Sequence, residues 1–326
     1  MRVLSGIQPS GKLHVGNYFG AMRQYLELQE KGHECFYFIA NYHAMTSVFD
    51  AKLLQEYTTE IARGYLAVGI DPNRSIFFRQ SDVPEVCELT WMLSCVTPMG
   101  LLQRCVSYKD KVEQGLAPNH GLFCYPVLQA SDIIIYDSNL VPVGQDQKQH
   151  LEVTRDIAVK FNNIYGQDVL TVPEPYIIAD SAVVPGLDGR KMSKSYDNTL
   201  ELFEPANRIK KKIMRIVTDS TPVEDPKNPD QCTAYALLKL VASEEESRQW
   251  ADRYRQGGMG YGDVKKRLAE LTNEMLEPYR QRYHELEKDP DYVEDVLRHG
   301  GRKAQETARQ LMDRVRHATG ISSGKY

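Results

Sequence analysis

The chain has 326 residues, of which 42% are hydrophobic and 26% are charged, and its formal net charge is −4. This composition is ordinary for a soluble globular protein, and the length indicates two domains. No segment is apolar enough to span a membrane, the N-terminal apolar run is too short for a cleavable signal, and the negative net charge limits any nucleic-acid contact to local basic patches. We therefore expect neither a membrane nor DNA among its partners.

Six cysteines are spread along the chain, at positions 35, 87, 95, 105, 124 and 232. No two of them form a Cys-x-x-Cys pair, and no histidine lies at a close metal-ligand spacing from them. The pattern gives a metal or iron–sulfur site little support, so no residue is predicted to be a metal ligand. We interpret the six side chains as reduced, mostly buried thiols of a cytoplasmic protein.

The first half of the chain alternates short apolar runs with helical patterns. The predicted strands cover residues 3–5, 35–40, 75–78 and 140–143. The predicted helices cover residues 17–31, 51–68, 85–94 and a segment from the last strand to about residue 165. Asn17 is a candidate cap of the first helix, and Trp91 is expected on the apolar side of the third. This order favours an α/β fold with a doubly wound, Rossmann-like parallel sheet.

Several polar residues follow predicted strands or share a helical face. His43 comes directly after the second strand, at the sheet edge where ligands bind, although a loop histidine without a role is the plainer interpretation. Tyr125, Gln129 and Asp132 have the i, i+4, i+7 spacing of one helical face, and Pro126 suits the beginning of a helix. A carboxylate before three isoleucines is costly to bury unpaired. Asp132 could accept a hydrogen bond from a ring donor of a ligand, or it could cap a helix or pair with a core arginine.

A second acidic candidate is Asp146, which follows Gly144 and Gln145 at the end of the fourth predicted strand. In nucleotide-binding folds an acidic residue often holds the ribose hydroxyls. As an N-terminal cap it would also favour the dipole of the next helix. Both interpretations can hold together.

The prediction of function depends most on the segment Gly189-Arg190-Lys191-Met192-Ser193-Lys194-Ser195. Two lysines stand three residues apart beside two hydroxyls, and mobile ammonium groups can close on a polyphosphate. Near the N-terminus, residues 6–17 form a glycine-rich turn between a strand and a helix, where free N–H groups suit a phosphate or ribose oxygen. Either element alone is more often a solvated loop or a structural turn. Together they predict a nucleotide site.

Beyond residue 202 the pattern becomes helical, and it predicts an all-helical C-terminal domain. The predicted helices cover residues 207–217, 234–241, 243–255, 262–283 and 303–318. We predict a Rossmann-like domain at 1–201, a helical domain at 202–290, and a final helix at 291–326 that packs back towards the first domain. One helix carries basic residues that form either a solvated face or a contact for an RNA backbone: Arg208, Lys210, Lys211, Lys212 and Arg215.

These segments together resemble the bacterial-type tryptophanyl-tRNA synthetases, a family of class I aminoacyl-tRNA synthetases. Residues 6–21 (GIQPSGKLHVGNYFGA) are similar to the family's form of the HIGH signature, and residues 191–195 match KMSKS letter for letter. Between them, residues 141–150 (VPVGQDQKQH) resemble a third block, and residues 217–220 and 260–262 echo the C-terminal region. The resemblance therefore covers nearly the whole chain.

The resemblance implies a cytoplasmic homodimer that activates L-tryptophan with ATP and Mg²⁺, releasing pyrophosphate. It then transfers the amino acid to the 2′-OH of the terminal adenosine of tRNA(Trp), releasing AMP, and residues 202–290 bind the anticodon. The catalytic cations would be Lys191, Lys194 and Lys111. The residues implied in ATP binding are Gln8, Pro9, Ser10, Gly16, Asn17, Gly144, Gln145, Asp146, Val183, Lys191, Met192, Ser193, Lys194 and Ser195.

The resemblance also implies an amino-acid pocket. Asp132 would accept the indole N–H, and Tyr125 and Gln147 would bind the amino group. The residues implied to line the pocket are His43, Gln129, Val143 and Leu4. Many members have Met where this chain has Gln129 and Phe where it has Leu4, and Tyr-x3-Gln-x2-Asp is the spacing with which tyrosyl-tRNA synthetases bind tyrosine. A tyrosine-specific enzyme is therefore one alternative, and a non-catalytic paralogue that binds tRNA or tryptophan is the other.

Overall fold

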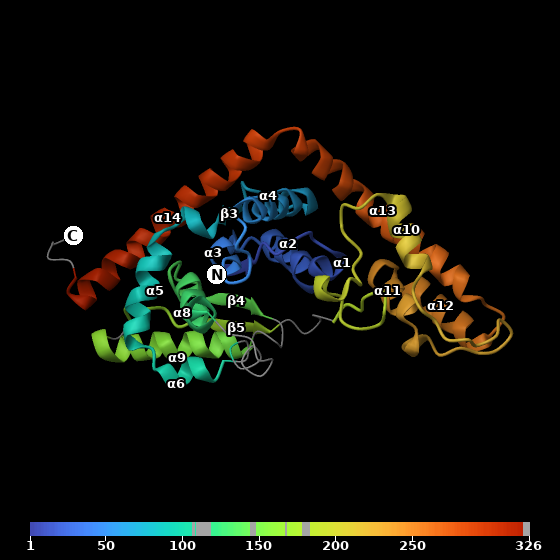
Figure 1. Ribbon diagram of the computed structural model, residues 1–326, viewed down its shortest axis with the longest axis horizontal. Coiled ribbons are helices and arrows are strands. Elements are labelled where there is room, and N and C mark those ends of the chain that lie inside the picture. Colours follow the sequence, from blue (N-terminus) through green and yellow to red (C-terminus); the bar gives the residue numbers. More distant parts are fainter. Residues whose placement is uncertain (106–107, 109–118, 144–147, 167, 178–182, 322–326) are drawn as a thin grey trace.

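The computed structural model describes residues 1–105, 108, 119–143, 148–166, 168–177 and 183–321. In this part of the chain, five strands form one parallel sheet in the order β3-β2-β1-β4-β5 (Figure 1). The strands are β1 (Arg2–Ile7), β2 (Glu34–Ile39), β3 (Ser75–Arg79), β4 (Leu140–Val143) and β5 (Glu174–Ile177). The chain starts in the central strand and builds outwards in both directions, so the predicted doubly wound fold is confirmed.

The sequence predicts the first four of these strands but not β5. Pro173 and Pro175 interrupt the apolar pattern there, and proline cannot donate a hydrogen bond to a neighbouring strand. β5 pairs only with β4, at the edge of the sheet, where one side of the strand needs no partner. An edge strand can therefore contain proline.

The helices fall into those that surround the sheet and those that follow it. The first group is α1 (Val15–Asn17), α2 (Arg23–Glu30), α3 (Asn41–Ala44), α4 (Ala51–Val68), α5 (Glu85–Val96), α6 (Met99–Gln103), α8 (His120–Ile134) and α9 (Lys148–Tyr165). The second group is α10 (Ala206–Met214), α11 (Thr233–Val241), α12 (Glu244–Gln256), α13 (Tyr261–Glu287) and α14 (Pro290–Thr319). Shorter turns are η1 (Tyr18–Met22), η2 (Gln80–Asp82), η4 (Lys194–Tyr196) and η5 (Pro229–Gln231).

Successive residues of the central strand point to opposite faces of the sheet, and each face packs against its own helices. Val3 belongs to a hydrophobic cluster that continues through α2 and α4 into α10, α11, α12 and α13. Its neighbour Leu4 belongs to a second cluster, formed with α5, α8, α9 and the second half of α14. This two-sided cover explains why nearly every residue of β2 is buried.

The last helix, α14, crosses the edge of the sheet. Near its beginning Val293 packs in the first cluster, and near its end Leu311 packs in the second. Between them, a Cβ on Gly300 would clash with the carbonyl oxygen of Phe77 in β3. The sequence predicts a final helix at 291–326 with its helical pattern at 303–318, and the structure has this helix at Pro290–Thr319, although a glycine pair more often interrupts a helix than lies inside one. Here glycine instead allows the helix backbone to touch the strand.

Two further predictions about α5 and α8 are wrong. Trp91 is 71% exposed and lies on the outer side of α5 rather than on its apolar side. Pro126 lies inside α8, which begins earlier, after an Asn119 side chain that accepts a hydrogen bond from the Leu122 N–H at 2.8 Å. The sequence signal for that cap was an asparagine before an apolar run.

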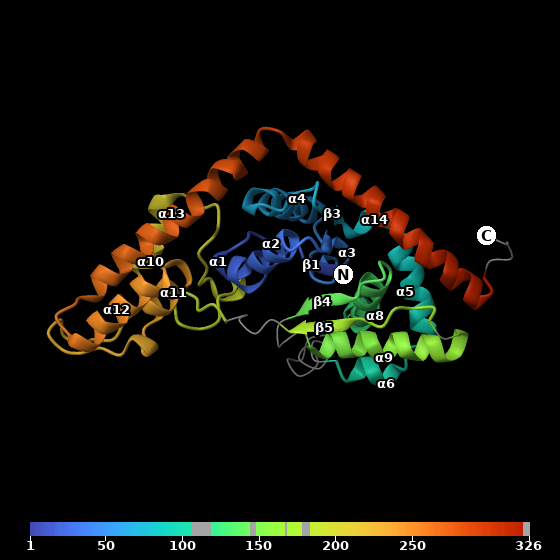
Figure 2. The same cartoon turned by 180° about the vertical axis from the view of Figure 1, so that it is seen from behind.

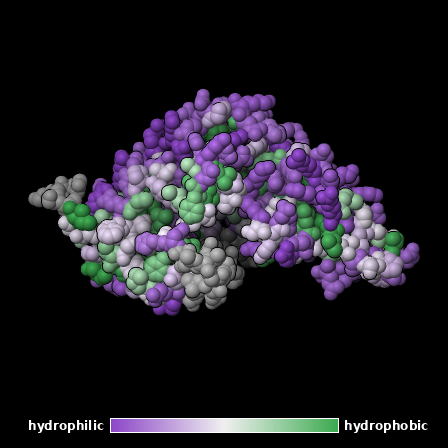
Figure 3. Space-filling model, viewed as in Figure 1, coloured by the Kyte–Doolittle hydropathy of each residue, from purple (hydrophilic) through white to green (hydrophobic). Residues whose placement is uncertain are grey.

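In the views of Figures 1 and 2, α13 and α14 form the two arms of a wide inverted V, which spans the sheet and its helices from above. Hydrophilic side chains cover most of the surface along these arms (Figure 3). Among the described residues, no helix has both the length and the apolar composition needed to cross a lipid bilayer. The domain boundaries at 201 and 290 stay predictions, because one hydrophobic cluster continues from the sheet into the helices beyond it.

Candidate active site

The lysine loop and the N-terminal glycine-rich turn lie against each other. The Lys194 Nζ is 3.5 Å from the Ser10 Oγ, and the Gly16 N–H points to the Met192 sulfur at 3.2 Å. A Cβ on Gly11, which has a φ of 114°, would lie 3.6 Å from the Lys194 side chain. The φ of Gly11 lies in the left-handed region that favours glycine, and a Cβ on Gly16 would be crowded by His14 at 2.9 Å and by Met192 at 3.3 Å. The predicted convergence of these two elements is present.

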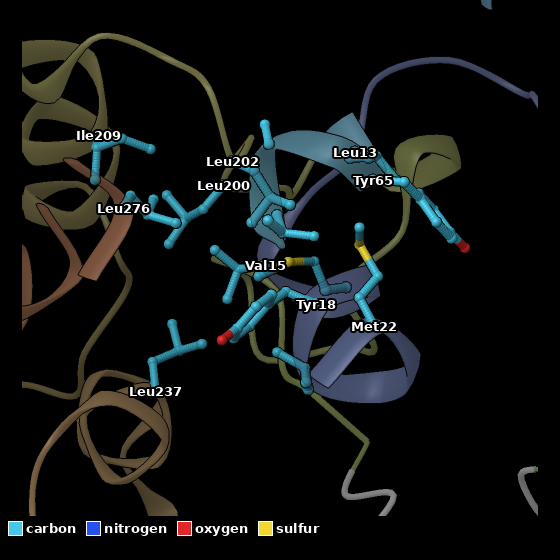
Figure 4. Close-up of a cluster of buried hydrophobic side chains, with 14 of the residues drawn as sticks. Leu13, Val15, Tyr18, Met22, Tyr65, Leu200, Leu202, Ile209, Leu237 and Leu276 are labelled. Atoms are coloured by element: carbon cyan, nitrogen blue, oxygen red, sulfur yellow. The ribbon is translucent and has the colours of Figure 1, made fainter. Parts of the chain in front are cut away.

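Backbone contacts hold the two segments together next to the lysines. The Val15 N–H donates to the Leu200 carbonyl at 2.8 Å, and the Leu202 N–H donates to the Leu13 carbonyl at 3.0 Å. The four side chains are buried and belong to the first hydrophobic cluster (Figure 4). Because backbone hydrogen bonds and apolar packing act at the same place, the chain following the lysine loop is fixed to the N-terminal turn.

Two titratable side chains face each other in this contact. Burial lowers the pKa of Lys194 to about 8. Burial, followed by the positive charge of Lys194, lowers the pKa of His14 to about 4, so His14 is neutral at pH 7. The sequence interpretation did not single out His14, although it lies in the segment that resembles HIGH. An anion at this place would stabilise the charged form of Lys194.

The sequence predicts that Asn17 caps the first helix from outside, and this prediction is wrong. Asn17 is the third residue of α1, and its side-chain oxygen accepts a hydrogen bond from the His14 N–H at 3.0 Å. A five-residue π-helical turn, η1, then precedes α2. The predicted single helix over residues 17–31 is therefore divided, and π-helical turns of this kind are frequent at functional sites.

Asp132 is the centre of the second half of the site. Its carboxylate is buried and receives hydrogen bonds from two side chains. The His43 Nε2 lies 2.7 Å from Oδ2, and the Gln80 Nε2 donates to Oδ1 and Oδ2 at 2.8 and 2.9 Å. Burial raises the pKa of Asp132, while the bonds from His43 and Gln80 act in the opposite direction. The described partners of Asp132 therefore support neither of the two alternative roles, which were to cap a helix or to pair with a core arginine.

Gln80 is a site residue that the sequence interpretation missed. It is completely buried, and its Oε1 accepts the Tyr42 N–H at 2.9 Å while its amide group holds Asp132. Gln80 lies just after β3, as His43 lies just after β2. Its position at the carboxyl end of a parallel strand was the available signal.

The remaining pocket candidates lie around α8. The Tyr125 hydroxyl is 2.5 Å from the His150 Nε2, and the rings of Tyr125 and His43 are 6.3 Å apart, edge to face. Gln129 is half-buried between Tyr125 and Asp132 on the same helix. Leu4 is buried on the sheet face that α8 covers. These side chains therefore gather on the α8 side of the sheet.

One contact joins the two halves of the site. The Gln8 side chain, just after β1, donates to the His43 carbonyl at 3.4 Å. Pro9, the next residue, is buried. The ends of β1, β2 and β3 thus bring Gln8, His43 and Gln80 to one edge of the sheet. A ligand at this edge could reach both Lys194 and Asp132.

Other predicted residues are less informative in the structure. Val143 is the last residue of β4, Val183 is 67% exposed, and Ser195 is exposed in η4. Outside the described residues lie Lys111, Gly144, Gln145, Asp146 and Gln147. Within the described residues, no group of three or more His, Cys, Asp or Glu side chains is placed to hold a metal ion.

The basic helix is α10. Its isoleucines, Ile209 and Ile213, are buried in the first cluster, and the basic side chains occupy the other sides. Lys212 is paired with Glu204 at 2.8 Å. Lys210 and Lys211 are exposed, so this helix offers cations to a negatively charged partner.

Comparison with known proteins agrees with this geometry. A tryptophan–tRNA ligase of Fusobacterium nucleatum is 52% identical over 330 residues, covering 100% of this chain and 99% of the relative. The crystal structure of Campylobacter jejuni tryptophanyl-tRNA synthetase, complexed with ADP and tryptophan, is 49% identical and superimposes with a TM-score of 0.91, covering 98% of this chain and 100% of that one. The crystal structure of Mycoplasma pneumoniae tryptophanyl-tRNA synthetase is 30% identical and superimposes with a TM-score of 0.82, covering 99% of this chain and 98% of that one.

The family model for class I tRNA synthetases (W and Y) matches residues 1–277, which include β1, the sheet edge and the lysine loop. This range also contains Lys194, Asp132 and Gln80. Given the match over most of the chain and relatives of high identity, the chain belongs to the class I tRNA synthetases of the W and Y family.

Proposed function

We propose that this chain is a tryptophan–tRNA ligase. It activates L-tryptophan with ATP and then transfers the amino acid to the 2′-OH of the terminal adenosine of tRNA(Trp). The observation that carries the proposal is the meeting of the Lys194 loop, the N-terminal turn and the buried Asp132 at one edge of the parallel sheet. A nucleotide and an amino acid bound there would lie next to each other.

In the first step, a carboxylate oxygen of tryptophan attacks the α-phosphorus of ATP. A new P–O bond forms, the bond to the bridging oxygen of the β-phosphate breaks, and pyrophosphate leaves with the electron pair. No covalent protein intermediate is needed. Lys191 and Lys194 stabilise the charge that develops on the phosphates, and Lys111 is predicted to join them. Mg²⁺ enters with ATP, because phosphate oxygens are ligands that it prefers.

Lys194 suits this role for a physical reason. It lies beside Ser10 at the glycine-rich turn, and its burial lowers its pKa to about 8. An ammonium group that has already lost part of its hydration interacts strongly with phosphate. Gly16 and Asn17 lie on the same turn, so we assign this surface to the ATP phosphates and ribose. Gln145, Asp146 and the other predicted ribose contacts stay predictions.

We assign amino-acid recognition to the Asp132 side of the site. An ionised carboxylate offers about four lone-pair directions, so Asp132 can accept an indole N–H in addition to the bonds from His43 and Gln80. A wrong amino acid without a ring donor would leave this buried acceptor unpaired, which is more costly than a missing methylene. Tyr125 and Gln147 are proposed to bind the amino group. Gln129, Leu4, Val143 and His43 are proposed to shape the pocket.

In the second step, the ribose 2′-OH attacks the carbonyl carbon of tryptophanyl-adenylate and loses its proton, and AMP leaves with the electrons of the acyl–oxygen bond. We propose that the exposed lysines of α10 contact the tRNA backbone and that the helical part at 202–290 reads the anticodon. The six free cysteines suit a reducing compartment such as the cytoplasm.

We also propose a homodimer that uses the surface of α5 and α6. Trp91 and Met99 on these helices are 71% and 62% exposed, and Figure 3 shows further hydrophobic side chains on this side of the molecule. A contiguous group of exposed apolar side chains, rather than single ones, is typical of an interface. Sedimentation of the wild type and of Trp91→Glu tests this, since the variant should shift towards the monomer.

ATP–pyrophosphate exchange is the test of the proposed activity. The wild type should catalyse exchange that depends on tryptophan, with tyrosine and phenylalanine weaker by several orders of magnitude. Preferred exchange with tyrosine would favour the tyrosine-specific alternative, which the Tyr125, Gln129 and Asp132 spacing permits. A folded chain that binds tRNA or tryptophan without any exchange would be the non-catalytic paralogue.

A further inference from the structure

We propose that Asn198 is a positioning residue that holds the lysine loop in the conformation required for adenylate formation. Asn198 follows the loop and is not itself one of the residues predicted to bind a substrate. The inference rests on the proposed function of Lys191 and Lys194, and it adds a residue to which neither the sequence interpretation nor the comparisons give a role.

The Asn198 side chain lies inside the loop and bonds to both of its sides. Its Nδ2 donates to the Asp188 carboxylate at 2.7 Å and to the Lys191 carbonyl at 3.1 Å. Its Oδ1 accepts the Ser193 N–H at 2.8 Å. The Asn198 backbone carbonyl accepts the Leu187 N–H at 3.0 Å. One side chain thus connects the turn before the first lysine with Ser193, one of the two residues between the lysines.

The orientation of this amide is determined by its partners. Two oxygens face the Nδ2 and one N–H faces the Oδ1. Turning the amide over would place oxygen against oxygen and N–H against N–H, so only one orientation satisfies all three contacts. The bond from Asn198 is also the main cause of the lowered pKa of Asp188. An aspartate at position 198 could not replace the donor.

Packing leaves the amide little freedom. Asn198 is only 3% exposed, and a Cβ on Gly186 would clash with the Asn198 side chain. The loop around it forms a short antiparallel contact between Pro185 and Lys191, closed by a hydrogen bond from the Met192 N–H to the Val184 carbonyl at 2.8 Å. Asn198 fills the interior of this small hairpin in place of an apolar core.

The bonds of Asn198 lie on both sides of Lys191 and one residue before Lys194. Without them, the Lys191 carbonyl and the Ser193 N–H would lose the hydrogen bonds that Asn198 provides, and the loop would sample more conformations. The two ammonium groups would then reach the phosphates in fewer of these conformations. Because small misplacements of charged groups raise the barrier steeply, the rate of activation should fall more than the affinity for ATP.

The chain contains a matched control. Asn162, in α9, is also buried, and its side-chain amide likewise donates one hydrogen bond to the backbone and accepts another from it. Its Nδ2 donates to the Leu170 carbonyl at 2.8 Å, and its Oδ1 accepts the Leu170 N–H at 2.9 Å. These bonds join the end of α9 to the segment that leads to β5, and neither residue belongs to the lysine loop. Asn162→Ala therefore removes the same chemistry from a place where only stability should respond.

The experiment measures two rates and the melting temperature in Asn198→Ala, Asn162→Ala and the wild type. Single-turnover formation of tryptophanyl-adenylate should fall on the order of 10²-fold in Asn198→Ala and stay near the wild-type rate in Asn162→Ala. Transfer to tRNA from adenylate supplied ready-made should change little in either variant. A general loss of structure would instead lower both rates together and would overturn the inference.

A double variant tests whether Asn198 acts through Lys194. If it does, adding Asn198→Ala to Lys194→Ala should cost less than Asn198→Ala costs in the wild type, because one of the two lysines to be positioned is already absent. Fully additive losses would contradict the proposal. Should Asn198→Ala fail to fold, Asp188→Ala at an exposed position removes one partner of the same amide. This variant should lower the activation rate by a smaller factor, and an unchanged rate would refute the inference.

The outcomes also separate this inference from the proposed function. Absence of exchange in the wild type would refute the ligase activity itself. Normal exchange in the wild type together with normal activation in Asn198→Ala would leave the ligase in place and refute only the positioning role.

Discussion

The Nζ of Lys194 lies 3.5 Å from the Oγ of Ser10, although 184 residues separate them in the chain. The contact forms because the residues that follow the lysine loop are bonded to the N-terminal turn through Leu200 and Leu202. A mobile cation is thereby kept next to the glycine-rich turn while the backbone around it is fixed.

Replacing Lys194 with alanine should lower the rate of tryptophanyl-adenylate formation by about 10²–10³-fold, by analogy with the loss of one preorganised electrostatic donor. The reason is that the variant lacks a cation placed where charge develops on the phosphates. Pre-steady-state measurement of pyrophosphate release gives this rate. Lys52→Ala serves as the control, since that side chain is 87% exposed on α4. A Lys194→Ala rate equal to that of the control would remove Lys194 from the mechanism.

Binding of ATP should be accompanied by proton uptake near pH 8. In the free protein the pKa of Lys194 is about 8, so a large fraction is neutral at this pH. The negative phosphates favour the charged form and raise the pKa, so a proton is taken up. Calorimetric titrations in buffers of different ionisation enthalpy measure the uptake. The proton uptake should be much smaller in Lys194→Met than in the wild type. Equal uptake in both proteins would mean that a group other than Lys194 binds the proton.

Stability should fall as the pH decreases from 6.5 to 4, in part because of His14. The pKa of His14 is about 4 in the folded state and 6.5 in a model peptide, so the unfolded state binds more protons in this window. The stability associated with neutral His14 is therefore fully present above pH 6.5. It is lost progressively as the pH falls towards 4, because protonation favours the unfolded state. Urea unfolding at pH 7 and pH 5 should show a smaller decrease for His14→Gln than for the wild type. An equal decrease would mean that His14 is not the responsible group.

Replacing Gln80 with methionine should raise the KM for tryptophan by about tenfold and lower the free energy of unfolding by about 1–3 kcal/mol. In this variant the buried Asp132 carboxylate loses the hydrogen bonds from Gln80 and keeps the one from His43. The Tyr42 N–H also loses the hydrogen bond to the Gln80 side-chain oxygen. Exchange kinetics and urea unfolding measure the two effects. Gln281→Met, at an exposed position of α13, is the control. If Gln80→Met changes stability alone, Gln80 does not position Asp132 for the substrate.

Two glycines should respond in opposite ways to alanine. In Gly300→Ala the new Cβ would clash with the Phe77 carbonyl, and the overpacking should cost about 1–3 kcal/mol of unfolding free energy. Gly262, in the first turn of α13, has no atom within 4 Å of an added Cβ. Its replacement should stabilise the protein by about 0.5–1 kcal/mol, because alanine is the better helix former. Equal changes at the two positions would show that α14 does not press against β3 in solution.

Local sequence signals predicted the elements whose ends carry their own caps. The helix predicted over residues 51–68 has these bounds in the structure, because the Asp50 side chain caps its beginning and Gly69 adopts a positive φ at its end. The strand predicted at 140–143 is likewise observed. These boundaries depend on a few neighbouring residues, so the sequence is sufficient to place them.

Features that depend on distant contacts could not be predicted. The glycine pair in α14 carries no local sign that Gly300 will lie against the backbone of Phe77, which is far away in the sequence. Gln80 carries no local sign that it will bond to Asp132, which comes 52 residues later. The two lysines, in contrast, were recognised because their spacing and the glycine-rich turn are patterns of short range.

The crossing of α14 over β3 also bears on aggregation. β3 is the outermost strand of the sheet, and an uncovered outermost strand offers unpaired N–H and carbonyl groups to any other extended chain. Gly300 brings the helix close enough to shield the Phe77 carbonyl from such a partner. A chain that ended before Pro290 would leave this border of the sheet open to intermolecular β-pairing. The final helix can cover this strand only after it has been synthesised, so we expect the strand to be most exposed to self-association while the C-terminus is still incomplete.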